Sequence, residues 1–403
     1  MDFDKAFLIL GILLIVAYLL KSMVSERFHI PGVTLYIILG VILGGSVTGY
    51  LNADIVDSLD FISDLALGLI AFSIGVELNK EVLQKVGKSI IIISFFEGLG
   101  AFLMVFISFY FFLHKALYFS LLLGAVASAT APAATVYVIK QFKSKGVLTS
   151  TILGVVGTDD AIALIIYVFA SLFASSLLLN KPVSIANYVL EPLKSISLSL
   201  IIGIIMAFIY NFMFWKKRHA DDITMGIISF LLIALSVSQK LHISELLTIM
   251  AFGCTLVNKN LKLANRTKDN LEFLTPLFLP WFFTLAASHL DVGLIKTISG
   301  MGIVYIISRA SGKIIFASLG AVVSKAPSTV RKFIGFSLIP QVGVAVALAL
   351  AVKRQFTQPI YGQAGIDMAY LIINLLLLTT IFTEIVGPLL TYFSLKKAGD
   401  IRS

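Results

Sequence analysis

Apolar segments long enough to cross a membrane make up most of the sequence. A transmembrane helix needs about 20 predominantly apolar residues, and 13 segments come close to that length or exceed it, with only short polar stretches between them. The sequence therefore predicts an all-α integral membrane protein with 13 transmembrane helices and no soluble regulatory domain. The predicted spans are residues 6–24, 33–51, 61–78, 89–113, 117–139, 147–179, 187–214, 223–238, 243–258, 273–290, 294–323, 333–352 and 367–393.

The composition agrees with a membrane protein. Of the 403 residues, 58% are hydrophobic and 13% are charged, whereas a soluble domain usually has about 25% charged residues. The single cysteine, Cys254, excludes an internal disulfide and a cysteine-only metal cluster. The net charge of +9 does not indicate a nucleic-acid partner, because basic residues of membrane proteins gather in cytoplasmic loops.

The distribution of basic residues predicts the orientation. The loops after odd-numbered spans and the C-terminal tail together have 21 Lys and Arg residues, and the opposite side has 8. Because basic residues are enriched on the cytoplasmic side, we expect the N-terminus outside and the C-terminus in the cytoplasm. The remaining two basic residues, Arg309 and Lys313, lie inside a predicted span.

Two adjacent carboxylates, Asp159 and Asp160, lie inside the segment 147–179. A charge at the bilayer centre costs a few kcal/mol even on the most lenient scale, so an intramembrane acid indicates a site for an ion or a proton. At about 1.5 Å per residue, the acids lie roughly 16 Å from the cytoplasmic end of their span, and Lys313 lies roughly 15 Å from the end of its own. We therefore expect the acids and the lysine at the same depth, with Arg309 one helical turn further outward on the lysine's face.

Two spans are interrupted by prolines, one at Pro132 and the other at Pro340. Proline removes a helix hydrogen bond, and the freed backbone groups must be satisfied by protein, water or an ion, never by lipid. Each proline is eight residues from a cytoplasmic lysine, Lys140 or Lys332, and the two spans run in opposite directions. This pattern predicts inverted repeats, spans 4–6 related to spans 11–13, with two crossed, broken helices, as in secondary transporters.

The same residues also allow a purely structural interpretation. Adjacent helical residues point about 100° apart, so one of Asp159 and Asp160 can meet Lys313 while the other faces a cavity between the broken helices. A structural buried ion pair, with the second aspartate capping a helix, would need no transported ion. The desolvation cost of such a pair rivals its Coulomb gain, and a second carboxylate beside it is costly unless it binds a cation or a proton.

Four motifs, in this order, resemble the monovalent cation:proton antiporter superfamily. The paired aspartates are similar to those of its two-aspartate branch, typified by bacterial sodium/proton antiporters. The motifs are Ala129-Thr130-Ala131-Pro132-Ala133-Ala134-Thr135, Gly157-Thr158-Asp159-Asp160-Ala161, Arg309 with Lys313, and Pro340-Gln341-Val342-Gly343-Val344-Ala345.

The resemblance implies a role for each residue of the central site. Asp160 would bind the cation and exchange it for a proton, whereas Asp159 would pair with Lys313. Thr130 and neighbouring backbone carbonyls would help to hold the cation. Glu97 and Glu384 are accessory candidates or internal partners of Arg309, and the other accessory candidates are Ser128, Thr158 and Gln341.

The resemblance also implies the fold and the assembly. Residues 89–179 and 294–393 would form an ion-binding core domain, and residues 1–88 and 187–290 a dimerisation domain. The core domain would move past the dimerisation domain in an elevator-like cycle. The protein would be a homodimer in the plasma membrane of a prokaryote.

The chemistry of these side chains suits exchange of Na⁺ or Li⁺ for H⁺. Na⁺ is a hard cation that needs oxygen ligands, which the carboxylates of Asp159 and Asp160, the Thr130 hydroxyl and unwound carbonyls supply. A proton competes for the same carboxylate, so a carrier that crosses loaded but seldom empty couples the two fluxes. If Na⁺ takes the charge partner of Lys313, the lysine could release a second proton and make exchange electrogenic. No cofactor is expected, because the ions are the substrates.

Other activities remain open at this point. Potassium/proton exchange is the alternative among transporters, because Gly75-Val76-Glu77-Leu78 is similar to the third-helix signature of potassium-efflux members. A bile-acid-type sodium symporter shares the architecture, but the Asp-Asp pair with Lys313 argues against it. An intramembrane aspartyl protease needs its two acids on different helices, and these acids are consecutive. A channel is disfavoured, since no filter-like repeat occurs.

Overall fold

The computed structural model describes residues 3–25, 32–179, 191–216, 219–241 and 243–401. The described residues are almost entirely helical, and six of their helices are long and apolar enough to cross a membrane. A seventh span results if the bent pair Leu261–Leu274 and Pro276–Ser288 is counted as one. The chain is therefore an all-helical membrane protein. The predicted beginning of the span 187–214 and the side chain of Glu77 lie outside the described residues.

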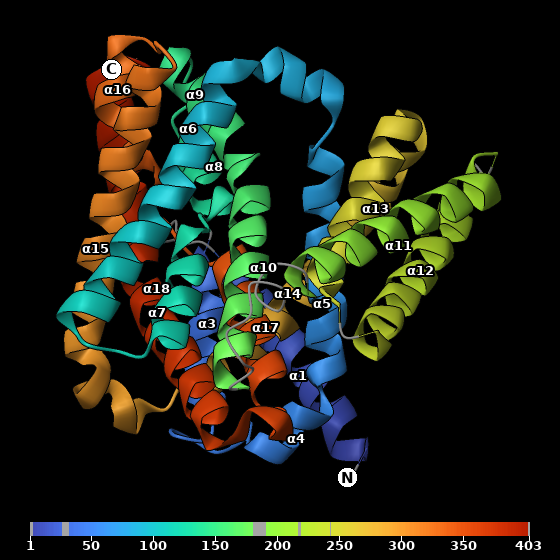
Figure 1. Ribbon diagram of the computed structural model, residues 1–403. Helices are drawn as coiled ribbons and strands as arrows, with labels where there is room; N and C mark the ends of the chain where they lie inside the picture. The colour runs from blue at the N-terminus through green and yellow to red at the C-terminus, as the bar shows by residue number, and fades with distance from the viewer. Residues whose placement is uncertain (1–2, 26–31, 180–190, 217–218, 242, 402–403) are drawn as a thin grey trace. The chain divides into compact units, whose positions relative to one another are not determined.

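The chain divides into two compact units, each of which is built from two separate stretches of sequence (Figure 1). Unit 1 comprises Met1–Asn79 and Leu193–Gly293, and unit 2 comprises Lys80–Pro192 and Leu294–Ser403. The four stretches alternate along the chain, so each unit joins an early and a late stretch. The predicted ion-binding residues all belong to unit 2.

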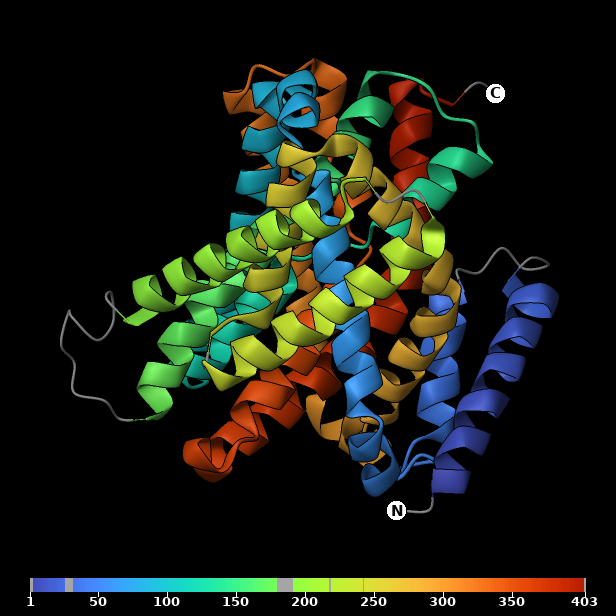
Figure 2. The ribbon, with the colours of Figure 1, turned by 90° about the vertical axis from the view of Figure 1, so that its right-hand side faces the viewer.

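Unit 1 holds eight α-helices among its described residues. They are α1 (Phe3–Leu20), α3 (Gly32–Leu43), α4 (Ala53–Ser58), α5 (Asp60–Glu77), α11 (Glu191–Phe214), α12 (Ala220–Lys240), α13 (Glu245–Lys259) and α14 (Leu261–Ser288), with a π-helical turn at Lys21–Ser25. Helix α1 lies along α3 (Figure 2).

Small residues let the helices of unit 1 approach until their backbones touch. A methyl group built on Gly75 of α5 would lie 2.2 Å from the Met250 carbonyl oxygen of α13, and one on Gly253 would lie 2.5 Å from the Phe72 oxygen. Both distances are shorter than any van der Waals contact, so only glycine fits. Close approach of this kind is how membrane helices gain packing energy without a hydrophobic driving force. Gly75 therefore has a role in helix packing that is independent of any function of the motif Gly75-Val76-Glu77-Leu78.

Helix α14 begins 12 residues earlier than the span predicted at 273–290. Its first part, Leu261–Leu274, meets Pro276–Ser288 at an angle of 59°, and the bend coincides with Pro276, whose ring cannot join the helix ladder. The first part is amphipathic, with Leu263 and Leu271 buried and Lys262 exposed. A search for continuous apolar runs misses such a helix, because only one of its faces is apolar.

Unit 2 holds nine α-helices among its described residues. They are α6 (Lys80–Ile107), α7 (Leu117–Ser128), α8 (Pro132–Gln141), α9 (Val147–Val156), α10 (Asp159–Leu178), α15 (Ile295–Val323), α16 (Ser328–Phe333), α17 (Gly343–Phe356) and α18 (Gly362–Ala398). Short helical turns occupy Ser108–Phe112, Gly335–Leu338 and Pro359–Tyr361, and a further turn, Val292–Leu294, lies at the boundary with unit 1. The predicted span 147–179 is thus two helices, because a turn at residues 157–158 separates α9 from α10.

Helices α6 and α15 cross closely within unit 2. A methyl group built on Gly312 would lie 2.6 Å from the Gly100 carbonyl oxygen, and one on Gly100 would lie 2.2 Å from the Phe316 Cβ. The crossing point is therefore fixed by two glycines. It lies one residue from Lys313 on α15 and three residues, close to one turn, from Glu97 on α6.

Candidate ion-binding site

Two interrupted helices meet at the centre of unit 2. Helix α7 ends at Ser128, Ala129 is extended, and α8 begins at Pro132. The second interruption separates the turn Gly335–Leu338 from α17, which begins at Gly343. The Ala131 N–H donates to the Pro340 carbonyl oxygen at 2.9 Å, so the two interruptions touch each other through their backbones.

Arg309 satisfies carbonyl groups that the interruptions leave without helix partners. Its guanidinium donates to the carbonyl oxygens of Ala127 at 2.9 Å, Ala129 at 2.8 Å and Ile339 at 2.6 Å. The side chain is only 1% exposed. Arginine suits this position, because its planar guanidinium group has five N–H donors and stays protonated. Arg309 thus binds both interrupted helices to α15.

Gln341, Tyr305 and Thr135 add further links between the interruptions. The Gln341 side-chain amide donates to the Val126 carbonyl oxygen at 3.1 Å and also exchanges a hydrogen bond with the Tyr305 hydroxyl. The Thr135 hydroxyl donates to the Ser337 carbonyl oxygen at 3.1 Å. Gln341 therefore holds the backbone in place. Its predicted accessory role in ion binding stays a prediction.

Lys313 makes three contacts with its ammonium group. The nitrogen lies 2.5 Å from Glu97 Oε2, donates to the Ser128 carbonyl oxygen at 2.5 Å, and donates to the Thr130 hydroxyl at 2.7 Å. The contacts with Ser128 and Thr130 are hydrogen bonds, and the contact with Glu97 is an ion pair. The lysine and Glu97 are both 0% exposed.

The ion-pair partner of Lys313 is thus Glu97, and not Asp159 as the resemblance implied. The physical reason is the crossing of α6 and α15 at Gly100 and Gly312, which brings Glu97 onto the lysine. Asp159 is still close enough to interact electrostatically with Lys313 and Glu97. The sequence indicates Glu97 as an accessory group or as an internal partner of Arg309, and depth along a span does not reveal which helices touch.

Asp159 and Asp160 form the first turn of α10. They are 1% and 6% exposed. Neither carboxylate oxygen of Asp159 has a hydrogen-bond partner within the described ranges. The N-terminus of a helix carries a partial positive charge that favours a carboxylate, but a buried carboxylate with unused oxygens remains a strong binding group for a cation or a proton.

Thr158 and Ser128, both accessory candidates, use their hydroxyls within the protein. The Thr158 hydroxyl lies 2.6 Å from the Ser94 hydroxyl and donates to carbonyl oxygens of α9. The Ser128 hydroxyl donates to the Ala125 carbonyl oxygen at 2.6 Å, while its own carbonyl faces Lys313. These hydroxyls therefore stabilise the end of α9 and the end of α7, which lie next to the candidate site.

Glu384 lies on α18, apart from the lysine's three contacts. Its side chain is 3% exposed, and Oε1 has no hydrogen-bond partner among the residues that the structure describes. It interacts electrostatically with Arg309. Arg309 also interacts electrostatically with Glu97 and Asp159, so the buried charges around Arg309 and Lys313 form one network.

The donor set of the site suits a hard monovalent cation. Within the described ranges, no group of three or more His, Cys, Asp and Glu side chains is arranged to hold a metal ion. A cation here would therefore rely on the carboxylates of Asp159 and Asp160 together with hydroxyl and carbonyl oxygens at the interruptions. A proton would compete for the same carboxylates.

The sequence matches a known family along most of its length. The family model described as sodium/hydrogen exchanger, transmembrane, matches residues 11–397. A Na⁺/H⁺ antiporter of Enterococcus hirae is 27% identical over 288 residues, which cover 69% of this chain and 72% of that protein. A probable Na⁺/H⁺ antiporter 3 of Methanocaldococcus jannaschii is 32% identical over 102 residues, 24% of either chain.

The fold is also similar to that of a solved transporter. The structure of the sodium proton antiporter MjNhaP1 from Methanocaldococcus jannaschii at pH 8 matches with a TM-score of 0.80. The match covers 98% of this chain and 99% of that chain at 17% sequence identity. At that identity the likeness concerns the fold alone.

Proposed function

The chain belongs to the sodium/hydrogen exchanger family, and we propose on that premise that it exchanges Na⁺ or Li⁺ for H⁺. It is a multi-pass membrane protein and a cation/proton antiporter, and not an enzyme. It needs no cofactor, because the ions are its substrates. The observation that supports the proposal most is the pair of buried aspartates at the start of α10, beside two interrupted helices.

Asp160 is proposed as the carboxylate that binds either the cation or a proton, with Asp159 beside it. Thr130 and the carbonyl oxygens of the interruption between α7 and α8 would complete the cation's oxygen shell. Because Glu97 is the ion-pair partner of Lys313, that lysine does not fully neutralise Asp159. Binding of a cation or of protons would balance the remaining negative charge at Asp159, and that need couples the two fluxes.

Electrogenic exchange of two protons per Na⁺ is part of the proposal. The sequence suggested Lys313 as the source of the second proton. The contact between Lys313 and Glu97 favours a different source, because the lysine already has a carboxylate partner that Na⁺ need not disturb. We propose that Asp159 and Asp160 each release one proton when Na⁺ binds.

Alternating access would come from movement of unit 2, which contains the site, as an elevator. We further propose 13 spans with inverted repeats, an extracellular N-terminus, a cytoplasmic C-terminus, a plasma-membrane location and a homodimer formed through unit 1. The meeting of two interrupted helices supports the repeats, and the excess of basic residues on one side supports the orientation.

Transport in proteoliposomes tests the function directly. A pH gradient is imposed, and Na⁺, Li⁺ and K⁺ are added in turn to the wild type and to Asp160→Asn. We expect Na⁺ and Li⁺ to dissipate the gradient with the wild type only, because asparagine cannot exchange a proton. Dissipation by K⁺ alone would favour the potassium/proton alternative, and no dissipation by any cation would overturn the proposal.

A further inference from the structure

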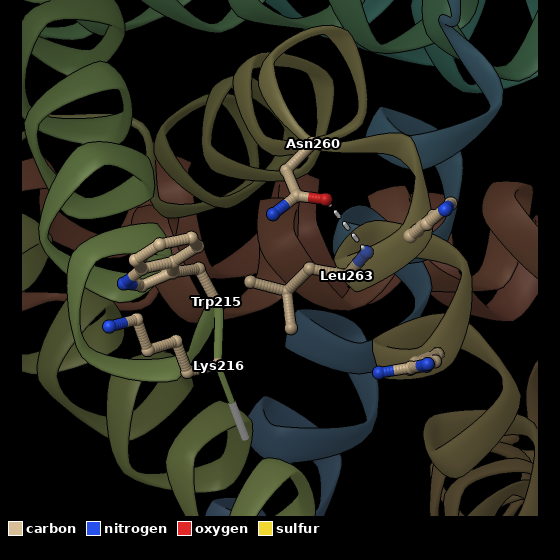
Figure 3. A pocket seen from close by; sticks show the side chains of 6 residues that line it. Trp215, Lys216, Asn260 and Leu263 are labelled. Atoms are coloured by element: carbon tan, nitrogen blue, oxygen red, sulfur yellow. Dashed lines mark hydrogen bonds between the residues drawn. The ribbon is translucent and has the colours of Figure 1, made fainter. Parts of the chain in front are cut away.

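A basic pocket lies in unit 1, away from the ion-binding residues in the sequence. It has a volume of about 650 Å³ and is lined by Trp215, Lys216, Asn260, Lys262, Leu263 and Arg266. Figure 3 shows Trp215 and Lys216 on one side, with Asn260 and Leu263 facing them. The pocket thus forms where α11 ends and α14 begins.

The walls of the pocket are held together by polar contacts between α11 and α14. The Asn260 amide donates to the Asn211 side-chain oxygen at 2.9 Å, and the Asn260 oxygen accepts from the Leu263 N–H at 3.2 Å. The Tyr210 and Thr267 hydroxyls lie 3.1 Å apart. These bonds fix the spacing of the two helix ends, so the pocket belongs to the packed part of unit 1.

The charge of the lining is entirely positive. Three of the six lining residues are Lys or Arg, and none is acidic. Within the part of the chain that the structure describes, Lys216, Lys262 and Arg266 form no ion pair, whereas Lys268 on the same helix pairs with Glu272 at 3.9 Å. The Lys216 ammonium lies 4.8 Å from the centre of the Trp215 ring, which places its charge at the pocket. The pocket therefore suits an anion.

Two features place this pocket at the surface of the membrane. The apolar span Lys194–Phe214 ends immediately before Trp215, and tryptophan is enriched where hydrocarbon gives way to head groups. The first part of α14 is amphipathic and bends by 59° from the part that follows. An amphipathic segment with Lys and Arg on its polar face is typical of a helix that lies in the interface.

The surroundings of the pocket distinguish a lipid from a free anion. Phe212, Met213 and Trp215 are 80%, 53% and 56% exposed along the end of α11. These side chains would cover the upper part of acyl chains, while the three cations reach the phosphate. A free phosphate would use the cations only and would leave the apolar surface beside them without a function.

We propose that the pocket between α11 and α14 binds the phosphate-bearing head group of an anionic membrane lipid. Lys216, Lys262 and Arg266 supply the charge, and the exposed end of α11 contacts the acyl chains. Basic pockets between membrane helices select anionic lipids in this way. The proposal does not depend on the identity of the transported ion.

Trp215 can report the binding without any transport assay. The chain has two tryptophans, so Trp281→Phe leaves Trp215 as the single emitter. The full-length protein is placed in bilayers of phosphatidylcholine with a small fraction of phosphatidylglycerol, and bromine is attached to the acyl chains of one lipid at a time. We expect brominated phosphatidylglycerol to quench Trp215 well above its share of the bilayer, and brominated phosphatidylcholine to quench in proportion to its share.

The variant that removes the charge is Lys216→Gln with Lys262→Gln and Arg266→Gln. Because each basic contact near a membrane surface contributes about fivefold in affinity, we expect the preference for phosphatidylglycerol to fall by about 100-fold. The matched control is Lys88→Gln with Lys325→Gln and Lys332→Gln, which removes the same charge from exposed sites on unit 2. The control should keep the preference.

Three results would overturn the proposal. One is equal quenching by both lipids in the wild type, and another is an equal loss of preference in the control. The third is reversal of the quenching by millimolar inorganic phosphate, which would make the pocket a site for a free anion. If the triple variant does not fold, Lys216→Gln alone tests the proposal, and its preference for phosphatidylglycerol should fall by about fivefold.

Discussion

At the scale of residues, the buried cations and carboxylates of unit 2 differ in how many partners the protein gives them. Lys313 has three donors and three partners, and Arg309 donates to three carbonyl oxygens. Both cations are therefore committed to the protein. The oxygens of Glu97 and Asp159 alike have no hydrogen bond among the described residues, but only Glu97 has an ion-pair partner there. A transported cation or proton is the natural partner for the Asp159 carboxylate.

Glu97 can be tested by removing its charge. In Glu97→Gln the ammonium of Lys313 stays buried without a carboxylate, and breaking one side of a buried pair costs about 3–5 kcal/mol. We expect a loss of that size in the free energy of unfolding, measured in detergent. Glu97→Asp should recover part of it. Glu272→Gln is the control, because Glu272 is exposed and its ion pair with Lys268, at 3.9 Å, lies at the surface. Unchanged stability in Glu97→Gln would contradict the assignment.

At the scale of helices, the two interruptions were predictable because the effect of proline on a helix is local. Pro132 begins α8, and Pro340 lies in the stretch between Leu338 and Gly343. The partner of Lys313 was not predictable in the same way. Depth along a span is read from sequence position, but the contact between α6 and α15 depends on a crossing that two glycines permit. The early start of α14 was missed because it is amphipathic.

The glycine crossing makes a prediction about transport. In Gly312→Leu the side chain would meet the backbone at Gly100, where even a methyl group would lie 2.6 Å from the carbonyl oxygen. Helices α6 and α15 would have to separate, and Glu97 would move away from Lys313. We expect proteoliposome exchange to fall by at least 10-fold, with destabilisation of the kind that overpacking causes, about 1–3 kcal/mol.

The matched control for this substitution lies on the same helix. Gly300 is exposed, and a methyl group there would meet nothing within 4 Å. Gly300→Leu adds the same side chain to α15 without a clash, so it should keep both stability and exchange. Equal losses in the two variants would mean that leucine harms α15 at any position, and the crossing would have no special role.

At the scale of the whole molecule, the proposed orientation requires the chain between α16 and α18 to cross the membrane. This stretch contains the second interruption and α17, a helix of 14 residues. Each piece is shorter than the roughly 20 residues of a continuous span, so a re-entrant loop would fit the lengths equally well. The distribution of basic residues favours a crossing, and the proposed orientation then puts Lys332 in the cytoplasm and Gln363 outside.

Single cysteines can distinguish the crossing from the re-entrant loop. In a Cys254→Ser background, which removes the one native thiol, Lys332→Cys and Gln363→Cys place a thiol at exposed positions on either side of α17. We expect a membrane-impermeant maleimide to label Gln363→Cys in right-side-out vesicles and Lys332→Cys in inverted vesicles. Detergent should make both labelled, as a control. Labelling of both cysteines from the same face would mean that the interruption is re-entrant. The two broken helices would then not cross the membrane in opposite directions, and the proposed inverted repeats would be wrong.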